Sequence, residues 1–162
     1  MKYVLIGKLV NTHGLKGEVR ILSDFKYKDR VFVPGMKFYL GKEKKEILVT
    51  SYRHHKMFEM IMMDGYNDIN QVLGFKGMYV FANKEDIKLN DGEYLDEDII
   101  GLTVFYNDKE LGIVRRIENH NGNYVLLITG DSEVLIPYNN SFIESINLEK
   151  KEMVVKNIDG LI

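Results

Sequence analysis

The amino-acid sequence predicts an all-β protein built from two small β-barrels with one or two short helices. Three observations support this fold class. Short segments of alternating apolar and polar residues recur along the 162 residues, turn-forming residues separate them, and very few segments have helical spacing. A polar segment near the middle divides the pattern into two halves. We therefore expect one barrel over residues 1–84, a linker over 85–93 and a second barrel over 94–162.

The first half contains six candidate strands, and closing them into a barrel would remove exposed sheet edges. Turns such as Pro34-Gly35 and Asp64-Gly65 separate the strands. Within the second strand, Val19 and Ile21 face one side, while Glu18 and Arg20 face the other. The expected strands are Tyr3–Val10, Gly17–Leu22, Met36–Leu40, Glu46–Tyr52, Met57–Met63 and Met78–Ala82.

One short helix is predicted at Asp68–Leu73 in the first half. Asn67 or Asp68 can cap its first turn, and Gly74 can end it in a left-handed conformation. Polar runs are interpreted as a break or as hairpin tips, at Asn11–Gly14, Gly41–Lys45 and Arg53–Lys56. Because glutamates interleave the lysines around residues 42–46, that tip is interpreted as a solvated surface.

The second half begins after the polar segment Asn83–Gly92 and again reads as strands. Asn121-Gly122 is a strong hairpin signal, and Pro137 ends a strand because it cannot donate a backbone hydrogen bond. Ser141–Asn147 is predicted as a short helical turn. The expected strands are Leu102–Tyr106, Glu110–Ile117, Tyr124–Thr129, Glu133–Ile136 and Met153–Val155.

Charge is distributed unequally between the two halves. Residues 1–90 hold sixteen Lys/Arg and ten Asp/Glu, a net of +6, whereas residues 91–162 hold six and fourteen, a net of −8. This split favours a first half that meets phosphate and a second half that meets a basic protein. The alternative is that the charges of small domains drift and the two halves merely attract each other.

Several function classes lack support in the sequence. The absence of cysteine excludes disulfides, thiolate metal sites and a cysteine nucleophile, and it fits a reducing cytoplasm. The near-match to a phosphate-binding loop at Gly35–Glu43 fails on spacing and on the hydroxyl that would bind magnesium. Adjacent His54 and His55 would diverge on a strand, so we expect no shared metal. No apolar run reaches membrane-spanning length. We expect a cytoplasmic monomer with no cofactor and no membrane partner.

The run Gly7–Arg20 resembles the N-terminal signature of the RimM family, bacterial factors for maturation of the small ribosomal subunit. Further segments follow in family order over essentially the whole chain, namely Asn67–Gly77, Gly92–Tyr94, Asp98–Leu102, Leu111-Gly112, Val134–Pro137 and Asp159–Leu161. The resemblance implies an N-terminal barrel similar to those of translation factors and a C-terminal PRC-type barrel. It also implies a non-catalytic factor that binds the immature 30S subunit and assists 16S rRNA processing and folding in the head. The implied protein partner is small-subunit ribosomal protein nineteen, a basic head protein.

Candidate rRNA-binding residues lie in two polar segments of the first half: His13, Lys16, Arg20, Arg53, His54 and Lys56. The cations can meet phosphate, and His13 can stack or donate a hydrogen bond. The alternative is that Gly14 and Gly17 only form a turn, that Glu18 pairs with Arg20, and that the second segment is a solvated loop.

Candidate residues for the ribosomal-protein contact lie at the start of the second half: Tyr94, Leu95, Asp96 and Asp98. Family members usually carry a Tyr-Tyr pair followed by Trp, and here only Tyr94 matches. A single Tyr can still anchor an interface, and the acidic residues would raise the association rate with a basic protein. The alternative is that Tyr94 packs between the two barrels.

Two rival functions remain at this stage. The chain could be an RNA-modifying or RNA-processing enzyme, with His13, His54, Glu18 and Asp24 as acid–base groups. It could instead be a scaffold whose second half docks a membrane or cytoskeletal partner, although no basic amphipathic helix supports membrane docking.

Overall fold

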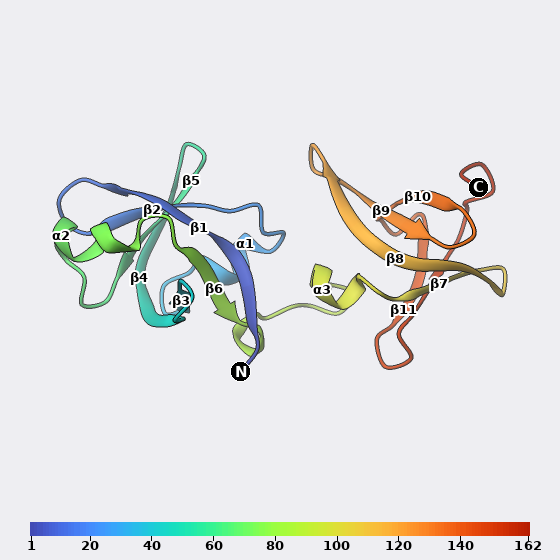
Figure 1. Ribbon diagram of the computed structural model, residues 1–162, viewed down its shortest axis with the longest axis horizontal. Helices are drawn as coiled ribbons and strands as arrows, with labels where there is room; N and C mark the ends of the chain where they lie inside the picture. The colour runs from blue at the N-terminus through green and yellow to red at the C-terminus, as the bar shows by residue number, and fades with distance from the viewer. The chain divides into compact units, whose positions relative to one another are not determined.

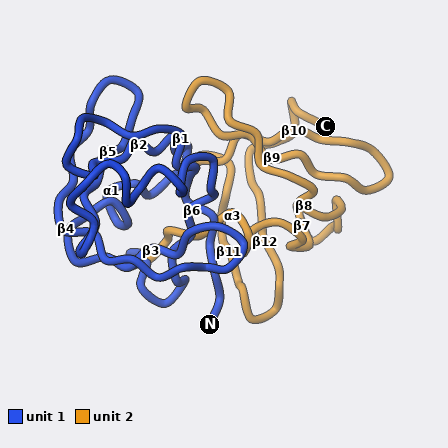
Figure 2. The backbone as a smooth tube through the Cα atoms, turned by 60° about the vertical axis from the view of Figure 1, so that its left-hand side comes forward, with its two compact units in different colours: residues 1–90 blue, residues 91–162 orange.

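The computed structural model describes all 162 residues and divides into two compact units, residues 1–90 and 91–162 (Figures 1 and 2). The division lies inside the segment 85–93 that was expected to be a linker. The first unit extends beyond residue 84, because Ile87 is 7% exposed and the Lys88 carbonyl accepts a hydrogen bond from Arg30. None of the helices has the length and hydrophobicity that a membrane-spanning helix requires.

The first unit is a closed barrel with strand order β1-β2-β5-β4-β3-β6, and all its strand pairs are antiparallel (Figure 1). The alternation predicted for the second strand is confirmed, since Val19 and Ile21 are fully buried while Glu18 and Arg20 are half-buried. All six predicted strands are present, as β1 (Tyr3–His13), β2 (Glu18–Leu22), β3 (Lys37–Leu40), β4 (Lys45–His55), β5 (Phe58–Met63) and β6 (Tyr79–Asn83).

Two strands run further than predicted, and this moves candidate functional residues from loops onto the barrel. β1 continues through the expected break to His13, with a bulge between Leu9 and Asn11. β4 continues through the expected tip to His55, with a bulge between Val49 and Ser51. A bulge accommodates an extra residue and bends the strand, so pairing persists where a polar sequence predicts a loop.

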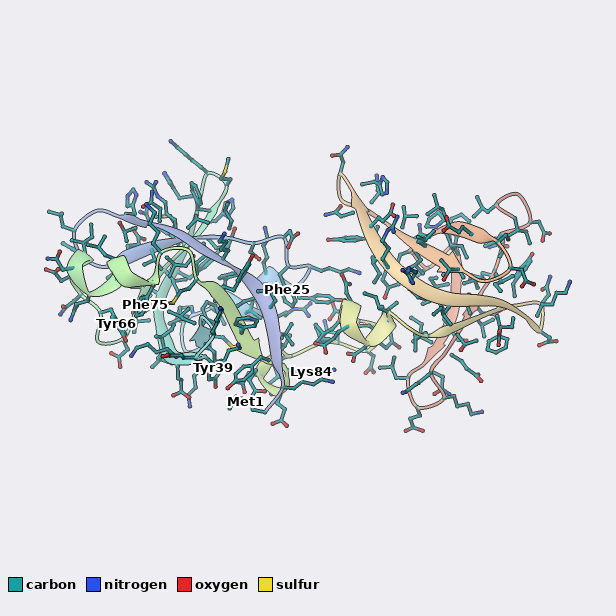
Figure 3. The ribbon with its side chains drawn as sticks, in the orientation of Figure 1. Met1, Phe25, Tyr39, Tyr66, Phe75 and Lys84 are labelled. Atoms are coloured by element: carbon teal, nitrogen blue, oxygen red, sulfur yellow. The ribbon has the colours of Figure 1, made fainter.

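The predicted helix is present as α2 (Ile69–Val72), followed by the 3₁₀ turn η1 (Leu73–Phe75). Asp68 caps it, as expected, in a capping box with Gln71. The role predicted for Gly74 is wrong, because Gly74 lies inside η1 and the left-handed residue is Gly77, with φ +91°. Phe75 then packs edge-on against Tyr66, with ring centroids 5.4 Å apart (Figure 3). The helix α1 (Lys28–Val31) and the 3₁₀ turn η2 (Lys84–Asp86) were not predicted.

The second unit is one six-stranded sheet with order β10-β9-β8-β7-β12-β11, antiparallel except for the β12–β7 pair. The helical turn predicted at Ser141–Asn147 is wrong, because Ile143–Asn147 pairs with β12 and packs Ile143 and Ile146 on the core. The elements are α3 (Asp96–Ile99), β7 (Thr103–Tyr106), β8 (Lys109–His120), β9 (Asn123–Thr129), β10 (Glu133–Pro137), β11 (Ile143–Asn147) and β12 (Glu152–Val155).

Candidate nucleic-acid interface

A basic cluster forms on the first barrel from residues of β1, β2 and the end of the β4–β5 hairpin. We define it as His13, Arg20, Arg53, His55 and Lys56. Arg20 is held in place, because its Nη2 lies 2.6 Å from His13 Nδ1 and its guanidinium lies over the Phe58 ring at 5.4 Å. An arginine can only donate, so His13 accepts at Nδ1 and carries its own proton on Nε2.

Glu18 lies beside the basic cluster and pairs with Arg53. Arg53 Nε and Nη2 each donate to a different carboxylate oxygen of Glu18 at 2.8 Å. The hydrogen bond from Arg53 lowers the pKa of Glu18, and the same bond raises the pKa of Arg53. The pairing of Glu18 with Arg20, weighed from the sequence, does not form. Arg53 keeps half its side chain exposed and can therefore still meet a polyanion.

His55 belongs to the basic cluster although the sequence did not single it out as a candidate. Its ring centroid lies 6.0 Å from that of His13. Partial burial lowers its pKa, and the positive charges of Arg53 and Lys56 act in the same direction. The signal that could have identified His55 is its two-residue spacing from Arg53, which puts both on one face of a strand once β4 is known to continue.

His54 is not part of the basic cluster, since it lies on the other face of β4. Its Nδ1 is 3.0 Å from Oε1 of Glu59, a carboxylate only 2% exposed. The Tyr52 hydroxyl donates to the same oxygen at 2.7 Å, and Lys28 Nζ lies 3.8 Å from Oε2. Burial, followed by the hydrogen bond to Glu59, raises the pKa of Tyr52 to about 12. His54 thus supports a buried carboxylate, which weakens its case as an rRNA ligand.

Lys16 is exposed on the turn between β1 and β2. The turn is fixed, because the Leu15 carbonyl accepts a 2.9 Å bond from the Ile69 amide. Gly17 has φ +92°, and a Cβ there would lie 2.8 Å from the Tyr66 carbonyl oxygen. Gly17 therefore lets the backbone of the turn approach the chain itself, and the Lys16 side chain remains exposed to solvent.

Three of the four acid–base groups of the enzyme hypothesis are engaged in separate contacts, beginning with His13, which accepts from Arg20. Glu18 binds Arg53, His54 binds Glu59, and Asp24 lies exposed beyond the end of β2. The structure contains no group of three His, Cys, Asp or Glu residues that could hold a metal ion.

The second candidate surface is the start of the second unit. Tyr94 is half-buried and packs against the core of its own unit, while Asp96 and Glu97 are exposed on the first turn of α3. Leu95 is only 4% exposed, so its side chain has little surface for a partner, and its role in the head-protein contact stays a prediction. Asp98 is half-buried, one residue before the fully buried Ile99.

Two family models match the chain in sequence, and they coincide with the two units. The RimM N-terminal domain matches residues 4–87, and the RimM PRC barrel domain matches residues 96–161. The chain belongs to the RimM family. The predicted all-β class in two domains is confirmed for this RimM-family chain: the first unit is a closed barrel, and the second, predicted as a PRC-type barrel, is a six-stranded sheet that matches the PRC barrel domain.

Relatives of this RimM-family chain match over nearly full length. A Ribosome maturation factor RimM from Staphylococcus haemolyticus is 39% identical, with 98% of each chain covered. One from Ligilactobacillus salivarius is 36% identical, with 99% of each covered. A solved 16S ribosomal RNA processing protein RimM from Pseudomonas aeruginosa is 24% identical with a TM-score of 0.49, covering 96% of this chain and 97% of that one.

Proposed function

We propose that this RimM-family chain is a non-catalytic factor that assists assembly of the 30S head and 16S rRNA processing in the cytoplasm. The observation that carries the proposal is the full-length similarity to proteins named ribosome maturation factors. In this proposal the first unit contacts rRNA, and the second unit contacts small-subunit ribosomal protein nineteen. The chain acts as a monomer.

The basic cluster supports the contact with rRNA. It presents Arg20 from β2, Arg53 from β4 and Lys56 from the β4–β5 turn, within a unit whose net charge is +6. Phosphate contacts of this kind supply affinity and position but little sequence information. Lys16 adds a further exposed cation on a fixed turn. His54 directs Nδ1 to Glu59, so in this proposal it contacts rRNA through the exposed part of its ring.

The acidic start of the second unit supports the contact with the head protein. Asp96 and Asp98 lie on α3, next to Tyr94, in a unit whose net charge is −8. Opposite charge raises the rate at which a basic protein associates, and an aromatic anchor supplies affinity. Because Tyr94 is half-buried, only the exposed part of its ring is available to a partner.

The test uses the full-length chain in two separate binding measurements. We expect it to co-sediment with immature 30S subunits in preference to mature ones, and to bind the purified head protein at moderate salt. Replacing both Asp96 and Asp98 by Asn should weaken the head-protein contact and leave the rRNA contact unchanged. Equal binding of mature and immature subunits, or a head-protein contact that survives the double substitution, would contradict the proposal. Turnover of precursor rRNA by the purified chain would instead support the rival enzyme.

A further inference from the structure

An apolar pocket of about 550 Å³ opens on the outer surface of the first barrel, where the β3–β4 hairpin meets β6. Its walls include Leu40, Phe75, Met78, Tyr79 and Phe81, and the hairpin residues 41–45 form its rim. No residue of the basic cluster lines it. A volume of this size falls within the range of pockets that bind small molecules.

Outward-facing aromatic rings distinguish this part of the barrel. Val80 and Ala82 are fully buried, so the alternation of β6 places Tyr79 and Phe81 on the outer face. Tyr79 is 52% exposed and Tyr3, on the neighbouring strand β1, is 38% exposed. A cluster of exposed aromatic rings around an apolar pocket indicates a ligand-binding or partner-binding surface.

Lysines surround these rings. Lys44 Nζ lies 4.3 Å from the Phe81 ring centroid and 5.5 Å from that of Tyr3, and Lys8 Nζ lies 5.4 Å from that of Tyr79. Lys42 and Lys45 lie on the pocket rim, where Glu43 is the one acidic residue. None of these four lysines forms an ion pair, whereas Glu46 beyond the rim lies 4.0 Å from Lys37. The interleaved hairpin, interpreted from the sequence as merely solvated, is therefore a positively charged rim.

The pocket is preformed by backbone hydrogen bonds. The Gly41 amide donates to the Tyr79 carbonyl at 2.9 Å, which fixes the β3–β4 hairpin to β6. The Gly77 amide donates to the Leu9 carbonyl at 2.7 Å, which fixes the segment after η1 to β1. A ligand entering such a pocket loses little free energy to ordering its walls.

We propose that this pocket binds an unstacked base of single-stranded RNA, with the base against Tyr79 and Phe81 and the flanking phosphates against Lys42, Lys44 and Lys45. Aromatic rings beside cations are the recurring chemistry of single-strand recognition, because every base has a π-face and every linkage carries a charge. The largely apolar walls offer few groups that could read base edges, so the pocket discriminates single strand from duplex more than one sequence from another. The inference rests on the proposed function only in taking RNA as the ligand.

The test measures fluorescence anisotropy of a labelled oligouridylate of about eight nucleotides with the full-length chain. We expect saturable binding. An RNA duplex or an abasic strand of equal length should compete at least about ten-fold less well than the unlabelled oligouridylate. Tyr79→Ala should weaken binding by about ten-fold, whereas Tyr79→Phe should retain it, because stacking needs the ring and not the hydroxyl. Lys44→Gln should weaken binding and flatten its salt dependence. Lys150→Gln, which removes the same charge from the second unit, and Met57→Ala, which trims an exposed apolar side chain elsewhere on the barrel, serve as matched controls.

Three results would overturn the inference. Equal competition by the abasic strand would show that charge alone holds the RNA, and unchanged affinity of Tyr79→Ala would move the contact elsewhere. Crosslinking of the pocket to a ribosomal protein, with no oligouridylate binding, would assign it to a protein segment. A different result would contradict the proposed function, namely that the unsubstituted chain fails to bind 30S precursors or the head protein.

Discussion

Arg53 and Glu18 lie 35 residues apart in the sequence and form a two-pronged ion pair on the outer face of the first barrel. The pair spans β5, because β2 and β4 both border that strand. Glu18 therefore places a negative charge beside the cations proposed to meet rRNA, while it orients the most exposed arginine among them. This carboxylate is expected to compete with phosphate for the Arg53 guanidinium.

Glu18→Gln should increase affinity for 16S rRNA fragments. The substitution removes the competing charge and keeps a side chain of the same size, so affinity should rise by about three-fold at low ionic strength. Binding measured by anisotropy on the isolated rRNA would detect this change. Glu110→Gln, which removes an exposed carboxylate from the second unit, is the matched control. A loss of affinity would mean that Glu18 aids binding by orienting Arg53.

Arg53→Gln should weaken rRNA binding and reduce its salt dependence. If Arg53 neutralises one phosphate, the slope of log affinity against log salt should fall by about 1. Titrations at several salt concentrations measure that slope, and Lys150→Gln should leave it unchanged. An unchanged slope for Arg53→Gln would show that Glu18 keeps the guanidinium away from phosphate.

The Glu18–Arg53 pair should stabilise the fold in a pH-dependent way. The hydrogen bond from Arg53 lowers the pKa of Glu18 below its ordinary value of 4.5 in the folded state. A carboxylate whose pKa is lower in the folded state stabilises the fold at pH values above its unfolded-state pKa. This stabilisation is lost as pH falls through the folded-state pKa. The difference in Tm between the unsubstituted chain and Glu18→Gln should therefore be present at neutral pH, shrink as pH falls below the ordinary value of 4.5 and vanish in strong acid. A difference that persists in strong acid would contradict the assignment.

Tyr52→Phe should destabilise the first unit because it removes a donor from buried Glu59. Because the lost hydrogen bond is made to a buried carboxylate, the free energy of unfolding should fall by about 1–3 kcal/mol. Tyr66→Phe is the control, since the Tyr66 hydroxyl has no such partner, and chemical denaturation measures both variants. The raised Tyr52 pKa of about 12 adds a second test. The difference in the free energy of unfolding between the two variants should hold below about pH 10 and shrink as pH approaches 12, and a difference that stays constant over this range would contradict the assignment.

The sequence predicted the strands well because their alternation reports directly on burial. Val19 and Ile21 are buried and Glu18 and Arg20 are not, as a two-residue period requires. Strand ends were predicted less well. His13, His54 and His55 look like loop residues in the sequence, yet bulges let β1 and β4 continue through them. The failed helix at Ser141–Asn147 has a similar cause, since pairing with β12 overrides weak local preference.

The sequence predicted the residue types of the candidate site but not which side chains pair with one another. Pairing of Glu18 with Arg53, and of His54 with Glu59, depends on which strands become neighbours in the closed barrel. Local spacing contains no such information, so it suggested Arg20 as the partner of Glu18. The aromatic pocket was missed for the same reason, because its hairpin residues 41–45 and its rings Phe75, Tyr79 and Phe81 come from separate segments that only the barrel brings together.

Tyr94→Ala should weaken the contact with the head protein by about 2 kcal/mol if Tyr94 is an anchor of that interface. Because Tyr94 also packs on the core of the second unit, the substitution should lower stability as well, and binding must be measured by calorimetry well below the Tm. Tyr138→Ala is the matched control, since Tyr138 packs on the same core outside the acidic segment. It should lower stability to a similar extent and leave the affinity for the head protein unchanged. Equal loss of affinity in both variants would mean that Tyr94 acts only through the fold, and unchanged affinity of Tyr94→Ala would remove it from the interface.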